Sequence, residues 1–95
     1  MSPELLAQLP GAEWVLPGLA DLRAGRLSIA GVVCLVGRPR LLELGLEVPA
    51  LPIPRPEHAL YAALEPLHGD ATHARYNAII RRLVSFTHAL ARAQG

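Results

Sequence analysis

The sequence predicts an all-α fold, a small bundle of about five helices that ends in a helical hairpin. The last third of the chain repeats apolar residues with the period of an α-helix, about 3.6 residues. Before it, prolines, glycines and potential capping residues divide the chain into short segments. The only clearly extended segment, 49–56, contains four prolines, so a β-strand elsewhere would have no partner. At this length the chain is expected to be one domain, 1–95.

Two helices are expected near the N-terminus. Ser2 can cap the first, because a proline at the first helical position and an acid in the first turn follow it. Pro10 and the glycine after it end this helix after about two turns. The next segment has apolar residues at helical spacing, but Pro17 interrupts it, so the regular helix is placed at 17–24. Gly25 then suits the left-handed backbone that follows a helix C-terminus.

The apolar segment 29–36 has two interpretations. Its valines and isoleucine favour a buried strand, whereas a capping residue at Ser28 and the lack of a pairing strand favour a buried helix. We expect the helix. Pro39 suits the start of a further short helix that ends at Gly45. The prolines of 49–56 then make an extended connector along the protein surface.

The C-terminal hairpin joins helices at 56–67 and 71–93. Pro66 should bend or end the last turn of the first helix, and Asp70 can cap the second. The predicted core stripe of the first helix is Leu60, Ala63, Leu64 and Leu67. That of the second helix is Tyr76, Ile79, Ile80, Leu83, Val84, Thr87 and Leu90, with Phe86 at its edge.

The composition indicates a protein whose apolar surface is covered by another chain. Apolar residues make up 52% of the sequence and charged residues only 18%, against about 45 to 50% and about 25% in typical domains. A small domain has much surface per residue, so we expect a homodimer, the commonest kind of assembly. The single cysteine, the acidic N-terminus and the absence of a long apolar run predict a cytoplasmic protein without a membrane segment.

Charge is distributed unevenly along the chain. Residues 1–22 carry three acids and no base, for a net charge of −3, and residues 71–95 carry four arginines and no acid, for +4. These two ends can pair within the chain or across a dimer, or the basic end can bind an anionic partner. Nucleic acid is a possible but not a favoured partner, because the overall net charge is only +1.

Residues 68–82 hold the candidate site. His68, Asp70 and His73 offer metal-ligand atoms, but a helix break separates them, so neither a metal nor another cofactor is expected. His73 and Asn77 lie at the border of the core stripe, where buried polar side chains would need partners that a helix interface commonly supplies. The hairpin would make an acid–base pocket if it brought them together with Tyr61, Tyr76 or Glu65.

Three functions follow from these patterns. The favoured one is a protein–protein interaction or regulatory module, homodimeric through apolar helix faces. The alternative is binding of nucleic acid or another anion by Arg75, Arg81 and Arg82, and the third is an enzyme that uses His68, Asp70 and His73. The candidate binding residues are His73, Arg75, Tyr76, Asn77, Arg81 and Arg82.

Overall fold

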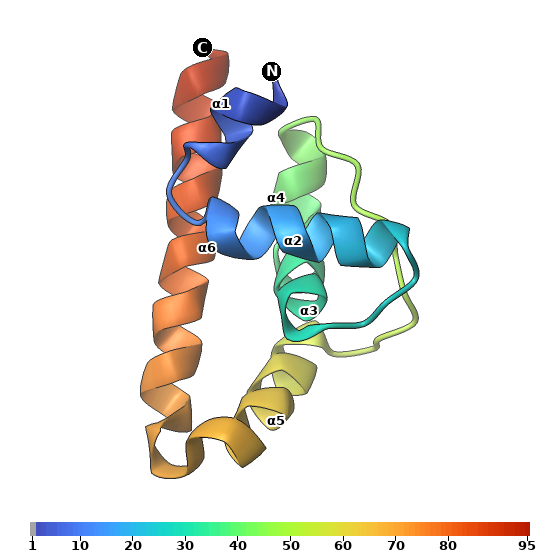
Figure 1. The fold of residues 1–95 in the computed structure, drawn as a ribbon, viewed down its shortest axis with the longest axis vertical. Helices are drawn as coiled ribbons and strands as arrows, with labels where there is room; N and C mark the ends of the chain where they lie inside the picture. The colour runs from blue at the N-terminus through green and yellow to red at the C-terminus, as the bar shows by residue number, and fades with distance from the viewer. Residues whose placement is uncertain (1) are drawn as a thin grey trace.

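The computed structural model describes residues 2–95, and this part of the chain is helical with no β-strand. The all-α prediction is therefore confirmed, with five helices of six or more residues and a shorter one at the N-terminus. Figure 1 shows the long last helix as a rod beside the shorter helices. The elements are α1 (Pro3–Ala7), α2 (Ala12–Arg23), α3 (Ile29–Val36), α4 (Arg38–Glu43), α5 (Pro56–His68), a 3-10 turn (Gly69–Ala71) and α6 (Thr72–Gln94).

The C-terminal hairpin agrees closely with its prediction. The helix α6 is unbroken over 23 residues, about 35 Å at about 1.5 Å per residue. The helix α5 runs past Pro66 and ends two residues later. Asp70 does not cap α6, which begins without a side-chain cap. The Thr72 hydroxyl instead donates to the Gly69 carbonyl at 2.6 Å, which fixes the turn but leaves the first amides of α6 without a side-chain cap.

The shorter helices also begin and end largely where the capping residues indicate. Ser2 accepts a hydrogen bond from the Leu5 amide, and Ser28 accepts one from the Gly31 amide at 3.0 Å. The segment 29–36 is therefore a helix, as expected. Gly25 has φ of 74°, the left-handed backbone predicted past the end of α2.

The prediction for α2 was wrong at its start. The helix begins at Ala12 and contains Pro17, although a proline in a helix interior costs about 3 kcal/mol. Apolar residues on both sides of this proline, Val15 and Leu19, are at most 2% exposed. Burial of this continuous apolar face offsets the hydrogen bond that the proline cannot make.

Two glycines let α2 lie close to its neighbours. A Cβ atom at Gly18 would collide with the Ala30 carbonyl and the Cys34 sulfur of α3. A Cβ atom at Gly11 would collide with the Arg82 carbonyl of α6. The N-terminal end of α2 therefore abuts α6, and the helix runs away from α6 and packs against α3 further along, as Figure 1 shows.

The buried arc of α6 is rotated from its predicted position. Phe86, expected at the edge, is fully buried, whereas Val84, expected in the stripe, is 42% exposed. The reason is that α6 contacts α2 and α3 as well as α5, which shifts the buried arc toward Phe86. In α5 the stripe is confirmed at Leu60 and Leu64 but wrong at Leu67, which is 64% exposed near the hairpin turn.

The proline-rich connector lies against the bundle, as predicted. Residues 46–55 form no regular element, and Leu51 and Ile53 are half-buried against the core. The segment is fixed at its start, where Val48 is buried and its carbonyl accepts a hydrogen bond from Arg38 Nε at 2.8 Å. No helix in residues 2–95 combines the length and the apolar character that crossing a bilayer requires.

Candidate functional site

Among residues 2–95 we describe three surface hollows that border α6, and most of the candidate residues line one or other of two of them. The arginine hollow is lined by Glu13, Trp14, Arg75, Ala78, Arg81 and Arg82. The tyrosine hollow is lined by Glu57, His58, Tyr61, Ala62, Glu65, His73 and Tyr76. The valine groove is lined by Val36, Gly37, Arg40, Ile80, Leu83, Val84, Thr87 and His88.

The arginine hollow joins the acidic and basic ends of the chain. Its volume is about 590 Å³, and α2 contributes Glu13 and Trp14 to it. Arg82 donates two hydrogen bonds to the Glu13 carboxylate, at 2.8 and 3.1 Å. The predicted pairing of the two ends thus occurs within the chain for this arginine. Among residues 2–95, Arg75 and Arg81 form no ion pair, so their charge faces solvent beside Trp14.

The Arg82 contact changes the charge balance of this hollow. The hydrogen bond from Arg82 lowers the pKa of Glu13, and the same contact raises the pKa of Arg82. Both groups are therefore held in their charged forms. The three arginines carry +3 and Glu13 carries −1, which leaves a net charge of +2 for an anionic ligand.

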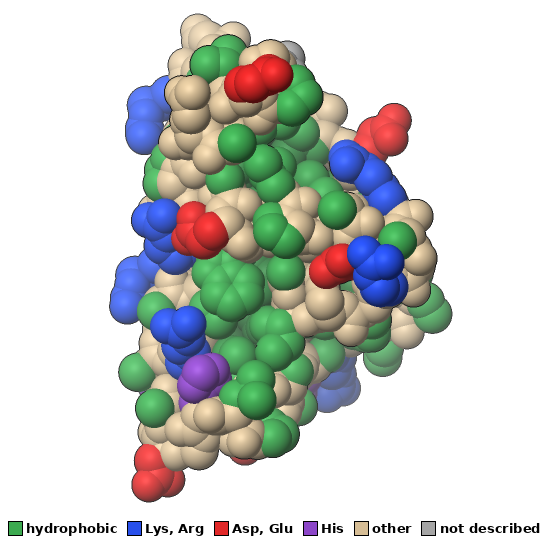
Figure 2. All heavy atoms as spheres, viewed as in Figure 1, with side chains coloured by type: hydrophobic (Ala, Val, Ile, Leu, Met, Phe, Trp, Pro, Cys, Tyr) green, Lys and Arg blue, Asp and Glu red, His purple; other side chains and the backbone are tan. Residues whose placement is uncertain are grey.

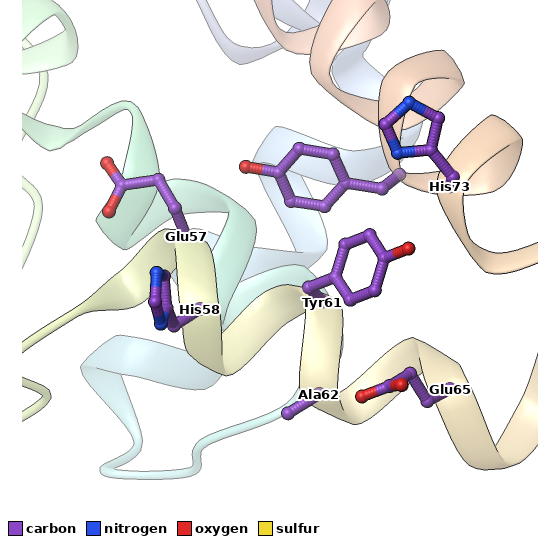
Figure 3. A pocket seen from close by; sticks show the side chains of 7 residues that line it. Glu57, His58, Tyr61, Ala62, Glu65 and His73 are labelled. Atoms are coloured by element: carbon purple, nitrogen blue, oxygen red, sulfur yellow. The ribbon is translucent and has the colours of Figure 1, made fainter.

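The tyrosine hollow lies between α5 and α6 and has a volume of about 560 Å³. Glu57, Tyr61 and Glu65 are four residues apart along α5, so one face of the helix presents all three. The Tyr61 ring lies 5.5 Å from the ring of Tyr76 and 6.4 Å from that of His73, and neither pair stacks flat. Figure 3 shows Tyr61 between Glu57 and Glu65 on α5, with His73 opposite it on α6.

Burial and the neighbouring carboxylate affect Tyr76. Desolvation raises the pKa of the Tyr76 hydroxyl, and the negative charge of Glu57 adds to this rise. Tyr76 therefore stays a neutral phenol, which can donate a hydrogen bond. The hollow as a whole is aromatic and acidic, in contrast to the arginine hollow.

The valine groove is apolar with a basic border. It has a volume of about 370 Å³ and runs between α6 and the junction of α3 with α4. Val36 and Ile80 are half-buried in it, and Val84 is more exposed. Arg40 and His88 lie at its border. Figure 2 shows how widely hydrophobic side chains reach one face of the molecule, with basic side chains along the α6 edge.

The structure gathers the candidate residues in two groups rather than one. His73 and Tyr76 face the tyrosine hollow, whereas the three arginines face the arginine hollow. Asn77 lines neither and is half-buried, and His73 is exposed, so the two polar side chains at the helix border are not both buried within one chain. The rotation of the buried arc toward Phe86 explains this outcome, because it turns that border toward solvent.

The structure brings together only some of the residues that the sequence suggests for acid–base or metal chemistry around 68–82. The hairpin does bring His73 together with Tyr61, Tyr76 and Glu65, but Asn77, the other residue of the acid–base hypothesis, does not line that hollow. No group of three or more His, Cys, Asp or Glu side chains in residues 2–95 could hold a metal ion. Cys34 is buried, and desolvation raises its pKa to about 12, so its thiol stays protonated.

Sequence reasoning missed three residues of these hollows. Glu57 of the tyrosine hollow has a signal in the four-residue spacing 57, 61, 65, which places it on the face of Tyr61, and His58 beside it lies outside that series. Trp14 has no such signal, because its place beside the arginines depends on how α2 crosses α6. Comparison of the chain with protein-family models, curated proteins and solved structures finds no match.

Proposed function

We propose that the protein is a protein–protein interaction module that forms a homodimer through the valine groove. The observation that carries this proposal is the exposure of Val84, which is 42% exposed in the middle of α6. Ile80 and Val36 line the same groove and add to its apolar surface. An exposed apolar groove of this kind is typical of a surface that another chain covers. The low content of charged residues, 18%, supports the same conclusion.

An antiparallel pairing of two α6 helices fits this groove. With a two-fold axis at Val84, helical spacing places Ile80 opposite the partner's His88, and Asn77 opposite the partner's Ala91. Asn77 is half-buried in one chain, and such a polar residue at a helix pair's border can fix the register. We place this module in the cytoplasm, where the buried thiol of Cys34 suits a reducing compartment.

Sedimentation equilibrium tests the homodimer. At micromolar concentration the wild-type protein should have about twice the chain mass of 10.2 kDa. Val84→Asp places a charge in the groove and should give a monomer. Leu67→Asp makes the same change at a residue that is 64% exposed at the hairpin turn, and should leave the dimer intact. A monomeric wild-type protein, or equal effects of the two substitutions, would reject the proposal.

Anion binding through the arginine hollow is a second candidate function. It is favoured by the meeting of Arg75, Arg81 and Arg82 around one hollow beside Trp14. Arginines can hold phosphates while an aromatic face stacks on a base, as in proteins that bind single-stranded nucleic acid. The positive charge of Arg75 and Arg81 would provide most of the attraction, because Arg82 already contacts Glu13.

Trp14 is the only tryptophan, so its fluorescence reports on this hollow. Titration with single-stranded oligonucleotides should quench it, and the quenching should weaken steeply with added salt. Arg75→Ala with Arg81→Ala should abolish the effect, whereas Arg23→Ala with Arg55→Ala removes the same charge elsewhere and should have little effect. Quenching that does not change with salt concentration, or that is the same in the wild-type protein and in both double variants, would count against this function.

A further inference from the structure

The tyrosine hollow has walls that suit a positively charged ligand. The rings of Tyr61 and Tyr76 both line it, with their centroids 5.5 Å apart and their planes at 52°. The face of an aromatic ring carries partial negative charge and attracts cations that come within about 6 Å. Two such rings at an angle can contact one cation from two directions. This arrangement does not depend on the proposed dimer or on the arginine hollow.

Two carboxylates add full negative charge to these walls. Glu57 and Glu65 lie on either side of Tyr61 on the exposed face of α5 (Figure 3). Among residues 2–95 the ion pairs involve Glu13, Asp21 and Glu43, and neither carboxylate of the hollow forms one. Their charge is therefore available to a ligand. Burial is the main cause of the raised pKa of Tyr76, and the negative charge of Glu57 adds to it, so Glu57 acts on this side of the hollow.

No arginine lines this hollow, although nine are present in the chain. An anion would meet two carboxylates and no guanidinium group, which excludes the phosphate-like ligands expected at the arginine hollow. A purely apolar ligand would remove the hydration of both carboxylates without replacing it. The walls thus disfavour purely apolar ligands and, with the imidazoles of His58 and His73 as the only other polar ring groups, also disfavour anions.

We propose that the tyrosine hollow binds an alkylguanidinium or alkylammonium group against the rings of Tyr61 and Tyr76, where it pairs with the carboxylate of Glu57 or Glu65 and is attracted by the other. A planar guanidinium fits best, because it can lie against an aromatic ring and donate two parallel hydrogen bonds to one carboxylate. The volume of about 560 Å³ lies within the range of small-molecule sites and leaves room for the attached alkyl chain beside Ala62. The cation can belong to a free small molecule or to an arginine side chain in a peptide.

Nuclear magnetic resonance provides a direct test. Tyr61 and Tyr76 are the only tyrosines, so every tyrosine ring signal comes from this hollow. Titration with n-butylguanidinium should shift these signals saturably. The neutral isostere n-butylurea, which has nearly the same shape, should not. Equal shifts with the two compounds would overturn the proposal, as would no shift with n-butylguanidinium, and this comparison uses only the wild-type protein.

Substitutions then test the carboxylates. Glu57→Gln with Glu65→Gln should weaken n-butylguanidinium binding about tenfold, since each exposed charge contributes modestly. Glu4→Gln with Glu47→Gln changes the net charge by the same amount at exposed positions elsewhere. It should leave n-butylguanidinium binding nearly unchanged, because salt screens charges at that distance. Equal weakening in the two double variants would overturn the role of the hollow. Circular dichroism verifies that both variants are folded.

A peptide probe distinguishes the two sources of the cation. The tripeptide N-acetyl-Gly-Arg-Gly-amide carries the same guanidinium with backbone on both sides. Tighter binding of this peptide than of n-butylguanidinium would support a protein or peptide arginine as the ligand. Binding that is equal or weaker would support a free small molecule, and loss of binding to both probes would overturn the site itself.

Discussion

The carboxylate of Glu13 receives two hydrogen bonds from the guanidinium of Arg82, at 2.8 and 3.1 Å, across 69 residues of sequence. The contact ties the first turn of α2 to the middle of α6. It lies next to Gly11, whose close approach to the Arg82 carbonyl brings the two helices together at the same point. One acid from the N-terminal end and one base from the C-terminal end thus meet at the crossing of α2 with α6.

Breaking this pair should destabilise the fold modestly. Both side chains are about half exposed, at 51% for Glu13 and 47% for Arg82, so solvent and salt screen their attraction. In thermal unfolding, Glu13→Gln and Arg82→Ala should each lower the Tm slightly, and the double variant should lower it by less than the sum. This departure from additivity should diminish in about 1 M salt, where the length over which charges interact is short. Additive effects at low salt would show that the contact contributes nothing.

Asp21 should make stability sensitive to acid. Its carboxylate accepts hydrogen bonds from the Ser28 hydroxyl at 2.6 Å and from Arg26 at 2.9 Å, and these two contacts lower its pKa below the ordinary 3.8. A group with a depressed folded pKa stabilises the protein above its unfolded pKa. That contribution disappears as the pH falls through the folded value.

The substitution Asp21→Asn should therefore lower the Tm at pH 7, and the difference from the wild-type protein should shrink below about pH 3.8. Thermal unfolding followed by circular dichroism from pH 7 to pH 2 measures it. Glu47→Gln, at an exposed acid without an ion pair in residues 2–95, is the matched control and should show no such convergence. A constant difference at all pH values would mean that the Asp21 contacts do not act through its charge.

Gly18 is required where α2 packs against α3. A methyl group there would collide with the Ala30 backbone, which cannot move without shifting α3. Gly18→Ala should therefore cost about 1 to 3 kcal/mol, the usual penalty of overpacking. Gly31→Ala is the control, because the atoms nearest to its added methyl are side-chain atoms at 3.3 Å and alanine favours a helix. Its effect on the free energy of unfolding should stay within about 1 kcal/mol. Urea unfolding of both variants measures the two effects, and similar values would contradict this account of the helix contact.

Local signals were sufficient for the order and type of the helices. Ser2, Ser28 and Gly25 act within a turn of their own position, so the sequence around each one predicts its role. The prediction at Pro17 was wrong because the lost hydrogen bond is a local effect, visible in the sequence, whereas the burial that offsets it involves other helices. This burial comes mostly from α3 and also from the distant α6.

The hollows were harder to predict for the same reason. The pairing of Tyr61 with Tyr76 follows from the hairpin, whose short turn leaves little freedom, and the sequence offered both tyrosines only as alternative partners of His73. The arginine hollow needs Trp14 to cross from α2, and helical periodicity in α6 alone cannot show which side of the helix a third element covers. Periodicity gives the width of an apolar face, whereas its direction depends on all the helices packed against it.

The two leucines at the end of α5 test the difference between a predicted apolar stripe and the face that the other helices bury. Leu64 and Leu67 were expected in one core stripe, yet Leu64 is 1% exposed and Leu67 is 64% exposed. Leu64→Ala leaves a cavity between α5 and the core, and should lower the free energy of unfolding by about 2 to 5 kcal/mol. Leu67→Ala removes the same atoms from solvent-exposed surface and should change it by at most about 0.5 kcal/mol. Urea unfolding of both variants at one protein concentration makes the comparison. Similar losses would show that Leu67 is covered in solution, by a second chain or by a rearranged hairpin turn.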